Sequence, residues 1–262
     1  MTRAALLLAG GAGTRLRPLS TDERPKQFLR IFDGVSLLRK TYERVSDLEV
    51  FVSTNERYRD LVREEIPEIA PERIVAEPAR RNTAPALALS CFEIAAQLGE
   101  ETAIACLPAD HYITGGYRAV LDRAFDYAEA HDALVTIGIT PTEPHTGYGY
   151  LDLGETIAPG VVRVNRFVEK PDLARAEKFL RAGHYAWNGG MFIWRASVFR
   201  RALEQHAPDV ARVTREQYEQ TPDISIDYAL MEKTRNVVSV RGDFEWSDVG
   251  SWEALRKIVP NI

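Results

Sequence analysis

The chain has 262 residues, of which 45% are hydrophobic and 27% are charged, and its formal net charge is −5. These proportions are typical of a globular protein, and the length suffices for a large core in one domain, or in one domain with an insertion. The negative net charge argues against a general nucleic-acid-binding surface, and no apolar run approaches the ~20 residues of a membrane span. We therefore expect neither nucleic acid nor a membrane as a partner.

The two cysteines, Cys91 and Cys106, lie inside apolar segments. This setting indicates buried thiols in a reducing compartment rather than a disulfide or a metal site. A charged residue and a strand-like run follow the initial methionine closely, so we expect no signal peptide. Together these features predict a cytoplasmic protein.

Short apolar runs alternate with longer amphipathic segments through the first 140 residues. The runs predict strands at 4–9, 50–53, 73–76, 102–107 and 133–139. The amphipathic segments predict helices at 36–45, 58–65, 83–98 and 117–131, the third with Thr83 as its cap. Such alternation predicts an α/β fold with a mainly parallel sheet, helices on both faces, and ligands beyond the carboxyl ends of the strands.

The alternation of apolar and amphipathic segments stops after residue 139, where prolines and glycines at 141, 144, 147 and 149 predict a loop. Beyond this loop, strands are predicted at 161–168, 191–194, 237–240 and 244–246, and helices at 173–182 and 196–206. No repeat, linker or low-complexity segment interrupts the chain. We therefore expect the second half to elaborate on the first and to share one cleft with it.

The stretch after the first predicted strand has the composition of a phosphate-binding loop. It contains Gly10, Gly11 and Gly13, followed by the cations Arg15, Arg17 and Lys26. Glycines let main-chain N–H groups approach an anion, and arginine and lysine neutralise its charge. The alternative is a glycine-rich turn that only connects two elements.

Two better-known glycine loops do not fit this stretch. A P-loop ends in Gly-Lys followed by Ser or Thr, whereas this loop continues Gly13-Thr14-Arg15. A dinucleotide-binding loop needs a third glycine where Leu16 stands, and Pro18 would interrupt the helix that should begin there.

Asp110 follows an apolar strand, where a carboxylate is costly unless it is solvated, paired or bound to a cation. Mg²⁺ takes one or two carboxylates together with phosphate oxygens, so Asp110 is a candidate metal ligand. The alternative is a cap of the following turn. Asp248 is a second candidate ligand far along the chain. For the neighbouring His111 we expect a loop histidine that bonds to the backbone rather than a metal ligand.

Other polar residues have both a structural and a functional interpretation. Asn82 and Thr83 could do no more than cap the helix that begins there. Glu169 and Lys170 could be a surface salt pair before a proline. The sequence assigns no role to the arginines at 80 and 81.

Short motifs, in order along nearly the whole chain, resemble those of the sugar-nucleotide pyrophosphorylases, a family of nucleotidyltransferases. They lie at 10–20, 25–28, 77–86, 107–111, 147–150, 167–171, 187–192 and 246–252. The form Pro-Lys-Gln-Phe at 25–28 is most similar to the bacterial mannose-1-phosphate guanylyltransferases. The resemblance implies a Rossmann-like nucleotide-diphospho-sugar transferase fold with a mainly parallel, mixed sheet. It also implies a single domain over 1–262, with a nucleotide-binding half at 1–140 and a sugar-phosphate-binding half at 141–262.

The resemblance further implies roles for individual residues. It assigns nucleotide binding to Ala9, Gly10, Gly11, Gly13, Thr14, Arg15, Glu77, Asn82, Thr83, Pro108 and Ala109. It assigns sugar-phosphate binding to Gly147, Tyr148, Gly149, Glu169, Lys170, Asn188 and Gly189. It makes Arg15, Lys26 and Asp110 catalytic, and it makes Asp110 and Asp248 the ligands of Mg²⁺.

By resemblance, the activity is the transfer of GMP from GTP to α-D-mannose 1-phosphate, which gives GDP-mannose and pyrophosphate by in-line attack with Mg²⁺. The implied partners are GTP and mannose 1-phosphate, and a homodimer is left open. Two alternatives remain: a transferase for another nucleotide or sugar, and a non-catalytic regulatory subunit that binds sugar nucleotides. The loop arginine and both aspartates argue against the second. Longer relatives continue into a left-handed β-helix or an isomerase domain, and neither is expected in this sequence.

Overall fold

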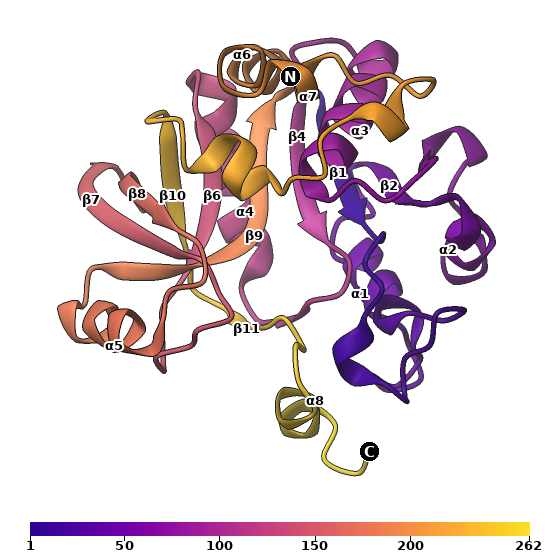
Figure 1. Cartoon of the computed structure of the whole chain (residues 1–262), viewed down its shortest axis with the longest axis horizontal. Helices are drawn as coiled ribbons and strands as arrows, with labels where there is room; N and C mark the ends of the chain where they lie inside the picture. The colour runs from indigo at the N-terminus through magenta and orange to yellow at the C-terminus, as the bar shows by residue number, and fades with distance from the viewer.

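Nine strands form one mixed sheet in the computed structural model, which describes residues 1–262 (Figure 1). The sheet order is β3-β2-β1-β4-β9-β6-β10-β8-β7. The strands are β1 (Arg3–Leu8), β2 (Glu49–Asn55), β3 (Ile74–Glu77), β4 (Ala103–Pro108), β6 (Leu134–Ile139), β7 (Tyr150–Ala158), β8 (Val161–Val168), β9 (Tyr185–Arg195) and β10 (Val237–Gly242). A separate two-stranded sheet pairs β5 (Tyr112–Thr114) with β11 (Glu245–Ser247).

The direction of the strands agrees with the predicted fold class. Strands β3, β2, β1 and β4 pair in parallel, as do β6 and β10. Strand β9 lies antiparallel between β4 and β6, and β8 lies antiparallel between β10 and β7. All strands except β8 and β9 therefore point the same way, so the predicted α/β fold with a mainly parallel, mixed sheet is confirmed.

Strand β9 connects the two halves of the chain. It comes late in the sequence but pairs with both β4 and β6, which lie before residue 140. Strand β7 also pairs with β9, so β9, β6, β10, β8 and β7 close into a ring of hydrogen-bonded strands. In Figure 1 the β7–β8 hairpin accordingly curls round to the start of β9.

Helices cover both faces of the sheet (Figure 1). They are α1 (Leu37–Glu43), α2 (Arg59–Glu65), α3 (Thr83–Leu98), α4 (Tyr117–Ala130), α5 (Leu173–Ala182), α6 (Ala196–His206), α7 (Pro208–Ala211) and α8 (Trp252–Ile258). Helices α1, α2, α4 and α5 share one buried core with Ala5 and Leu7 of β1, and α3 and α6 share another with Ala4 and Leu6. The alternation of side chains along β1 thus supplies both faces.

A smaller core joins the beginning and the end of the sequence. Leu16, Phe32 and Leu37 from the first forty residues pack with Val249 and Leu255 of the last segment. Val249 has a φ of 48°, which is unusual for a β-branched residue. Its burial in this cluster fixes the chain immediately after Asp248.

The boundaries of several elements differ from the prediction. The predicted strand at 191–194 is the end of the eleven-residue β9, and β7 occupies part of the region after the breaker-rich loop, where no strand was expected. Strand β5, helix α7 and helix α8 were also not predicted. The cap of α3 is Asn82 rather than Thr83, whose hydroxyl instead accepts a hydrogen bond from the main-chain N–H of Ile226.

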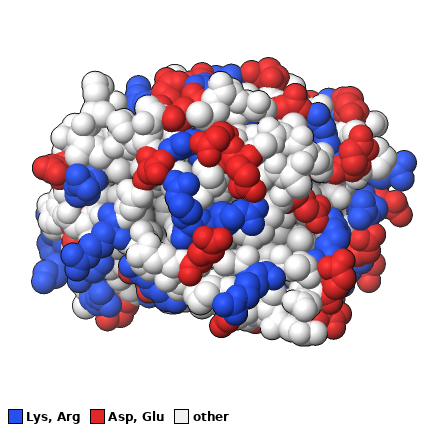
Figure 2. Space-filling model, turned by 90° about the horizontal axis from the view of Figure 1, so that it is seen from above, with Lys and Arg blue, Asp and Glu red and all other residues white.

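The surface mixes charges of both signs. Figure 2 shows Lys and Arg interspersed with Asp and Glu over the face that it presents. Many of these groups are paired, as Arg195 and Arg201 are with Asp132 and Arg200 is with Glu100. None of the helices has the length and apolar character needed to cross a membrane.

Candidate active site

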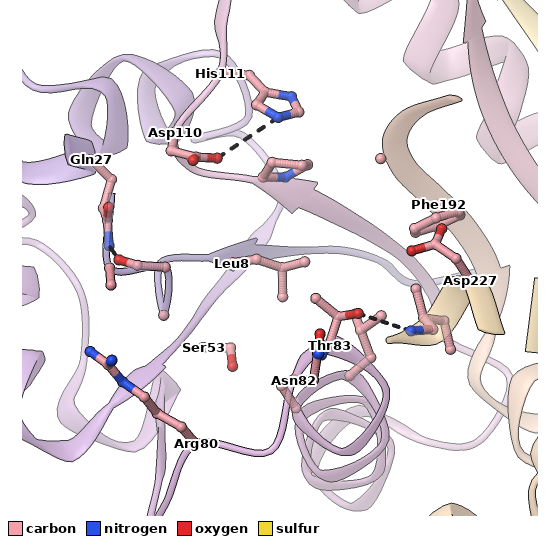
Figure 3. Close-up of a pocket in the computed structure, with 18 of the residues that line it drawn as sticks. Leu8, Gln27, Ser53, Arg80, Asn82, Thr83, Asp110, His111, Phe192 and Asp227 are labelled. Carbon is pink, nitrogen blue, oxygen red and sulfur yellow. Dashed lines mark hydrogen bonds and ion pairs between the residues drawn. The ribbon is translucent and has the colours of Figure 1, made fainter. Parts of the chain in front are cut away.

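A cleft of about 570 Å³ opens at the carboxyl ends of β1 and β4 (Figure 3). Many residues assigned by resemblance line it: Gly10, Gly11, Arg15, Glu77, Asn82, Thr83, Pro108, Asp110, Lys170 and Asn188. The others do not line it: Ala9, Gly13, Thr14, Lys26, Ala109, Gly147, Tyr148, Gly149, Glu169, Gly189 and Asp248. Several members of the second group contact members of the first, so the fold gathers residues from both halves at one place.

The side chain of Gln27 holds the glycine loop after β1 by two hydrogen bonds. The side-chain Nε2 of Gln27 donates to the main-chain oxygens of Ala9 and Gly11, at 2.7 and 2.9 Å. Gly13 has a φ of 62°, and a Cβ at this position would lie 2.7 Å from the main-chain nitrogen of Lys26. Position 13 therefore needs glycine both for its conformation and for the close approach of Lys26.

Lys26 joins the two predicted metal ligands. Its buried ammonium lies 2.8 Å from Asp110 Oδ2 and donates to the main-chain oxygen of Asp248 at 2.6 Å. Arg15 lies 3.5 Å from Asp248 Oδ2. Burial by itself raises the pKa of Asp110, but the charge of Lys26, assisted by His111, outweighs it, so the net pKa lies below the ordinary value. Two carboxylates and two cations thus meet at one edge of the cleft.

Asp248 is oriented by further hydrogen bonds. Its Oδ1 accepts from the Tyr148 hydroxyl at 2.8 Å and from the main-chain N–H of Gly250 at 3.0 Å. Burial and the charge of Asp248 raise the pKa of Tyr148, which therefore stays a proton donor. The Tyr148 ring stacks on His145 and meets Trp246 edge-on, which fixes the hydroxyl in place.

The expectation that His111 bonds to the backbone is wrong. The indole N–H of Trp246 donates to His111 Nδ1 at 3.1 Å, and the two rings meet edge-on. Burial lowers the pKa of His111, so its ring is neutral near pH 7. Because Nδ1 accepts, the proton lies on Nε2, which is 3.8 Å from Asp110 Oδ1. Sequence reasoning missed this contact because β5 and β11, which bring the two residues together, are far apart in the chain.

Glu77 lies at the other side of the cleft, beneath the glycine loop. Its carboxyl accepts from the Tyr218 hydroxyl at 2.7 Å and from the Ser53 hydroxyl at 3.4 Å. Burial raises the pKa of Glu77 to about 7. A Cβ at Gly10 would lie 3.1 Å from Glu77 Oε1, so the loop passes close over this carboxyl.

Arg80 and Arg81, to which the sequence assigned no role, have different hydrogen-bond partners. Arg80 lines the cleft, and its guanidinium donates to the Tyr58 hydroxyl at 3.3 Å. Arg81 also lines the cleft and donates to the main-chain oxygen of Glu219. Neither is paired with a carboxylate, so both leave positive charge at this end of the cleft.

The remaining polar residues lie at the opposite end. Lys170 Nζ is 2.6 Å from Glu169 Oε1, and Asn188 Nδ2 donates to Asp227 Oδ1 at 3.3 Å. Asp227 was missed from the sequence, although an acid beside the apolar residues at 229–231 is a signal that could have drawn attention to it. Gln27 lies in the motif at 25–28, but the sequence alone assigned it no role.

Asp110 and Asp248 are suited to a divalent metal ion by the chemistry of their oxygen donors. Both are carboxylates, the ligands that hard cations prefer, and substrate phosphate oxygens would complete the coordination. No group of three or more His, Cys, Asp or Glu side chains is arranged to hold a metal ion. The donor set therefore fits a cation that is shared with a phosphate-bearing ligand.

Comparisons with known proteins agree with this geometry. A family model described as nucleotidyl transferase matches residues 4–262. A mannose-1-phosphate guanylyltransferase of Sinorhizobium fredii is 43% identical over 96% of this chain and 54% of its own length. One from Escherichia coli is 40% identical over 97% of this chain and 59% of its own length. The chain thus spans less than two thirds of these curated relatives.

A solved structure supports the same relationship. It is described as a mannose-1-phosphate geranyltransferase from Thermus thermophilus, and it is 37% identical in sequence. It superposes with a TM-score of 0.90, over 98% of this chain and 79% of the other. The match of the family model over nearly all residues, together with these relatives, shows that the chain belongs to the nucleotidyl transferase family.

Proposed function

We propose that this chain carries a mannose-1-phosphate guanylyltransferase activity, which transfers GMP from GTP to α-D-mannose 1-phosphate and releases pyrophosphate. The observation that carries the proposal is the convergence of Arg15, Lys26, Asp110 and Asp248 at one edge of the cleft. The names of the curated relatives at about 40% identity support the choice of substrates. The unbridged, buried thiols of the two cysteines support a reducing, cytoplasmic setting.

The reaction needs no covalent intermediate on the protein. An oxygen of mannose 1-phosphate attacks the α-phosphorus of GTP in line with the departing pyrophosphate. The protein has to bring two polyanions together and hold them, and proximity of this kind can supply about 7–11 kcal/mol in well-oriented systems. Arg15 and the glycine-loop N–H groups would stabilise the leaving pyrophosphate, and Lys26 would contact the phosphates at the reacting centre.

Nucleotidyltransferases of this kind generally use a divalent metal ion. We infer that the ion is Mg²⁺ and that Asp110 and Asp248 hold it together with substrate phosphates. Bound there, the ion would neutralise phosphate charge at the reacting centre. Lys26 contacts the Asp110 carboxylate and the main chain at Asp248, and Arg15 lies 3.5 Å from the Asp248 carboxylate, so both proposed ligands are held by neighbouring cations.

The nucleotide base would lie between the glycine loop and the start of α3. Gly10, Gly11, Asn82 and Thr83 line this part, and the Glu77 carboxyl lies within it. A guanine offers N1–H and an amino group, for which Glu77 is an acceptor, and its O6 needs a donor such as a main-chain N–H. A site with such fixed partners rejects bases that leave them unpaired.

The sugar phosphate would occupy the end formed by the second half of the chain. Lys170 is a cation for its phosphate, and Glu169 and Asn188 offer acceptors and donors for hydroxyl groups. Glycine at position 149 lets Glu169 come close, since a Cβ there would lie 2.6 Å from Glu169 Oε2. We assign Gly147, Tyr148, Gly149 and Gly189 to the support of this subsite.

The test is a measurement of pyrophosphate release by the purified protein with Mg²⁺. Four nucleoside triphosphates are each combined with the 1-phosphates of mannose, glucose and N-acetylglucosamine. We expect release with GTP and mannose 1-phosphate. Preferred turnover of another pair would keep the chemistry but overturn the named substrates. Absence of turnover with every pair, while sugar nucleotides still bind, would instead favour a regulatory role.

A further inference from the structure

The cleft has a second acidic end, separate from Asp110 and Asp248. Figure 3 shows the carboxyl group of Asp227 directed into the cleft beside Phe192, on the side opposite Gln27 and Arg80. Asp227 begins a π-helical turn, Asp227–Met231, whose last three residues are buried. Turns of this kind are rare and occur frequently at functional sites.

The turn that carries Asp227 is fixed to the nucleotide side of the cleft. The main-chain N–H of Ile226 donates to the Thr83 hydroxyl at 2.9 Å, a bond drawn in Figure 3. The main-chain N–H of Ala84 donates to the oxygen of Ile224 at 3.1 Å. Asp227 is therefore held in place by the first turn of α3 and not by a free loop.

Asn188 beside it has a fixed orientation. Its Oδ1 accepts from the Thr136 hydroxyl at 3.1 Å and from the main-chain N–H of Gly190 at 3.2 Å. Because the N–H of Gly190 can only donate, its bond identifies the oxygen, and Nδ2 must face Asp227, to which it donates at 3.3 Å. Only one of the two Nδ2 hydrogens is used within the chain, so the other can be donated to a ligand.

The charge immediately around Asp227 disfavours an anionic group at its carboxyl. Burial, and then the charge of Glu169, raise the pKa of Asp227 to about 6, and Lys170 offsets this only in part. Lys170, the proposed cation for the sugar phosphate, also lies 2.6 Å from Glu169 Oε1, and Glu232 accepts from the main-chain N–H of Glu169. A partly buried carboxylate in this setting gains most from a neutral group that donates hydrogen bonds, such as a hydroxyl.

We propose that Asp227 is a specificity-determining residue that accepts a hydrogen bond from one hydroxyl of the hexose, next to a hydroxyl that Asn188 contacts. This inference rests on the proposed function. In that function Lys170 holds the phosphate of the sugar substrate, and Asp227, which lines the same end of the cleft, would recognise an uncharged hydroxyl of the same substrate. Lys170 and Asp227 would thereby orient the sugar phosphate by its charged group and by one hydroxyl.

The test compares the wild type with Asp227→Ala and Asp227→Asn, using mannose 1-phosphate and its monodeoxy analogues. We expect the KM for mannose 1-phosphate to rise about 10- to 100-fold in Asp227→Ala, while the KM for GTP stays within about twofold, since the lost bond involves a charged acceptor and the sugar alone. One monodeoxy analogue should bind the wild type more weakly than mannose 1-phosphate does. Asp227→Ala should bind that analogue and mannose 1-phosphate equally well. A residue with only a structural role would not produce this selective loss of discrimination.

The matched control is Asp223→Asn, which makes the same change of charge at an exposed residue of the same segment. It should leave both KM values unchanged. The inference would be overturned if removal of each hydroxyl of mannose 1-phosphate raised KM by the same factor in the wild type and in Asp227→Ala. Thermal unfolding of each variant shows whether it has folded.

Equilibrium binding separates failure of this inference from failure of the proposed function. Titration calorimetry with GDP-mannose uses the wild type and Asp227→Ala. If the wild type binds GDP-mannose and the variant binds it equally well, only the role of Asp227 is wrong. If the wild type neither binds GDP-mannose nor turns over any pair of substrates, the proposed function is wrong, and the role of Asp227 is rejected with it.

Discussion

Lys26 connects Asp110 to the segment that carries Asp248 at one edge of the cleft. Its buried ammonium compensates the charge of the Asp110 carboxylate and donates to the main-chain oxygen of Asp248, so it connects distant parts of the chain. Removal of one partner from such a pair leaves the other without compensation, and this costs more than the pair itself contributes.

We therefore predict that Lys26→Met lowers the free energy of unfolding by about 2 kcal/mol, below the ~3–5 kcal/mol of a fully buried pair because Asp110 is partly exposed. Pyrophosphate release should fall by at least about 100-fold, the effect typical of the loss of one electrostatic group at a reacting centre. Urea unfolding and the release assay measure the two effects.

The control is Asp110→Asn, alone and combined with Lys26→Met. Alone, it should fold normally and lose most of its turnover across a Mg²⁺ titration, since it removes a proposed metal ligand. In combination, it should restore the stability lost by Lys26→Met without restoring activity, because no uncompensated carboxylate remains. A double variant no more stable than Lys26→Met would show that the ion pair does not hold this edge together.

Glu77 makes stability depend on pH. Its pKa of about 7 in the folded protein exceeds the ordinary 4.5, so the folded state binds the proton more tightly. The stabilising contribution is complete below about pH 4.5 and is lost as the pH rises to about 7. The shift corresponds to roughly 3 kcal/mol.

We accordingly predict that Glu77→Gln removes this part of the pH dependence. The variant should gain stability relative to the wild type as the pH rises from 4.5 to 8, because glutamine stays neutral. Urea unfolding at a series of pH values measures the difference. The same exchange at the exposed Glu23 is the control, and parallel curves for Glu77→Gln and wild type would contradict the prediction.

Among the elements, helix α8 connects core packing to the cleft. Leu255 of α8 is fully buried with Leu16 and Val249, and Asp248 immediately precedes Val249. A buried Val249 at positive φ is held by its surroundings rather than by its own preference. Loosening of this cluster should therefore alter the position of Asp248.

We predict that Leu255→Ala lowers stability by about 3 kcal/mol, as is usual for truncation of a buried leucine. The variant should also need more Mg²⁺ for half-maximal pyrophosphate release, with a smaller effect on the maximal rate. Leu173→Ala, at an exposed leucine of α5, is the stability control. An unchanged Mg²⁺ requirement would show that α8 contributes to stability alone.

Elements defined by local signals could be predicted from the sequence. Helix α5 has the predicted bounds because Asp172 caps its start and Gly183, at a φ of 74°, ends it. Strand β8 and helix α6 also match their predicted ranges. Strand β7 could not be predicted, since its pairing with β8 shifts register repeatedly and depends on β9.

The candidate site likewise has parts that local sequence signals predict and parts that depend on contacts between distant segments. The glycine loop and Asp110 follow strands directly, so the sequence indicates their position at the carboxyl edge of the sheet. The contacts of Asp248 and His111 depend on the pairing of β5 with β11, which links distant segments. Asp227 lies on a π-helical turn fixed to α3, and no local pattern in the sequence specifies that arrangement.

At the scale of the whole molecule, residues 1–140 and residues 141–262 contribute strands to one sheet. Strand β9 pairs with β4 on one side and β6 on the other, so neither half can lose its strands without exposing the edge of the other. The expected single domain over 1–262 therefore leads us to predict one cooperative unfolding transition.

The chain provides a probe for each half. All four tryptophans lie after residue 140: Trp187, Trp194, Trp246 and Trp252. Both cysteines lie before it, and both are buried. We predict that tryptophan fluorescence and pulsed thiol labelling give the same urea midpoint, because Trp194 of β9 shares one core with both cysteines and Trp187 of β9 lies in the other. Labelling of the thiols at lower urea than the fluorescence change would show that residues 1–140 unfold first, and the two halves would then be separate units.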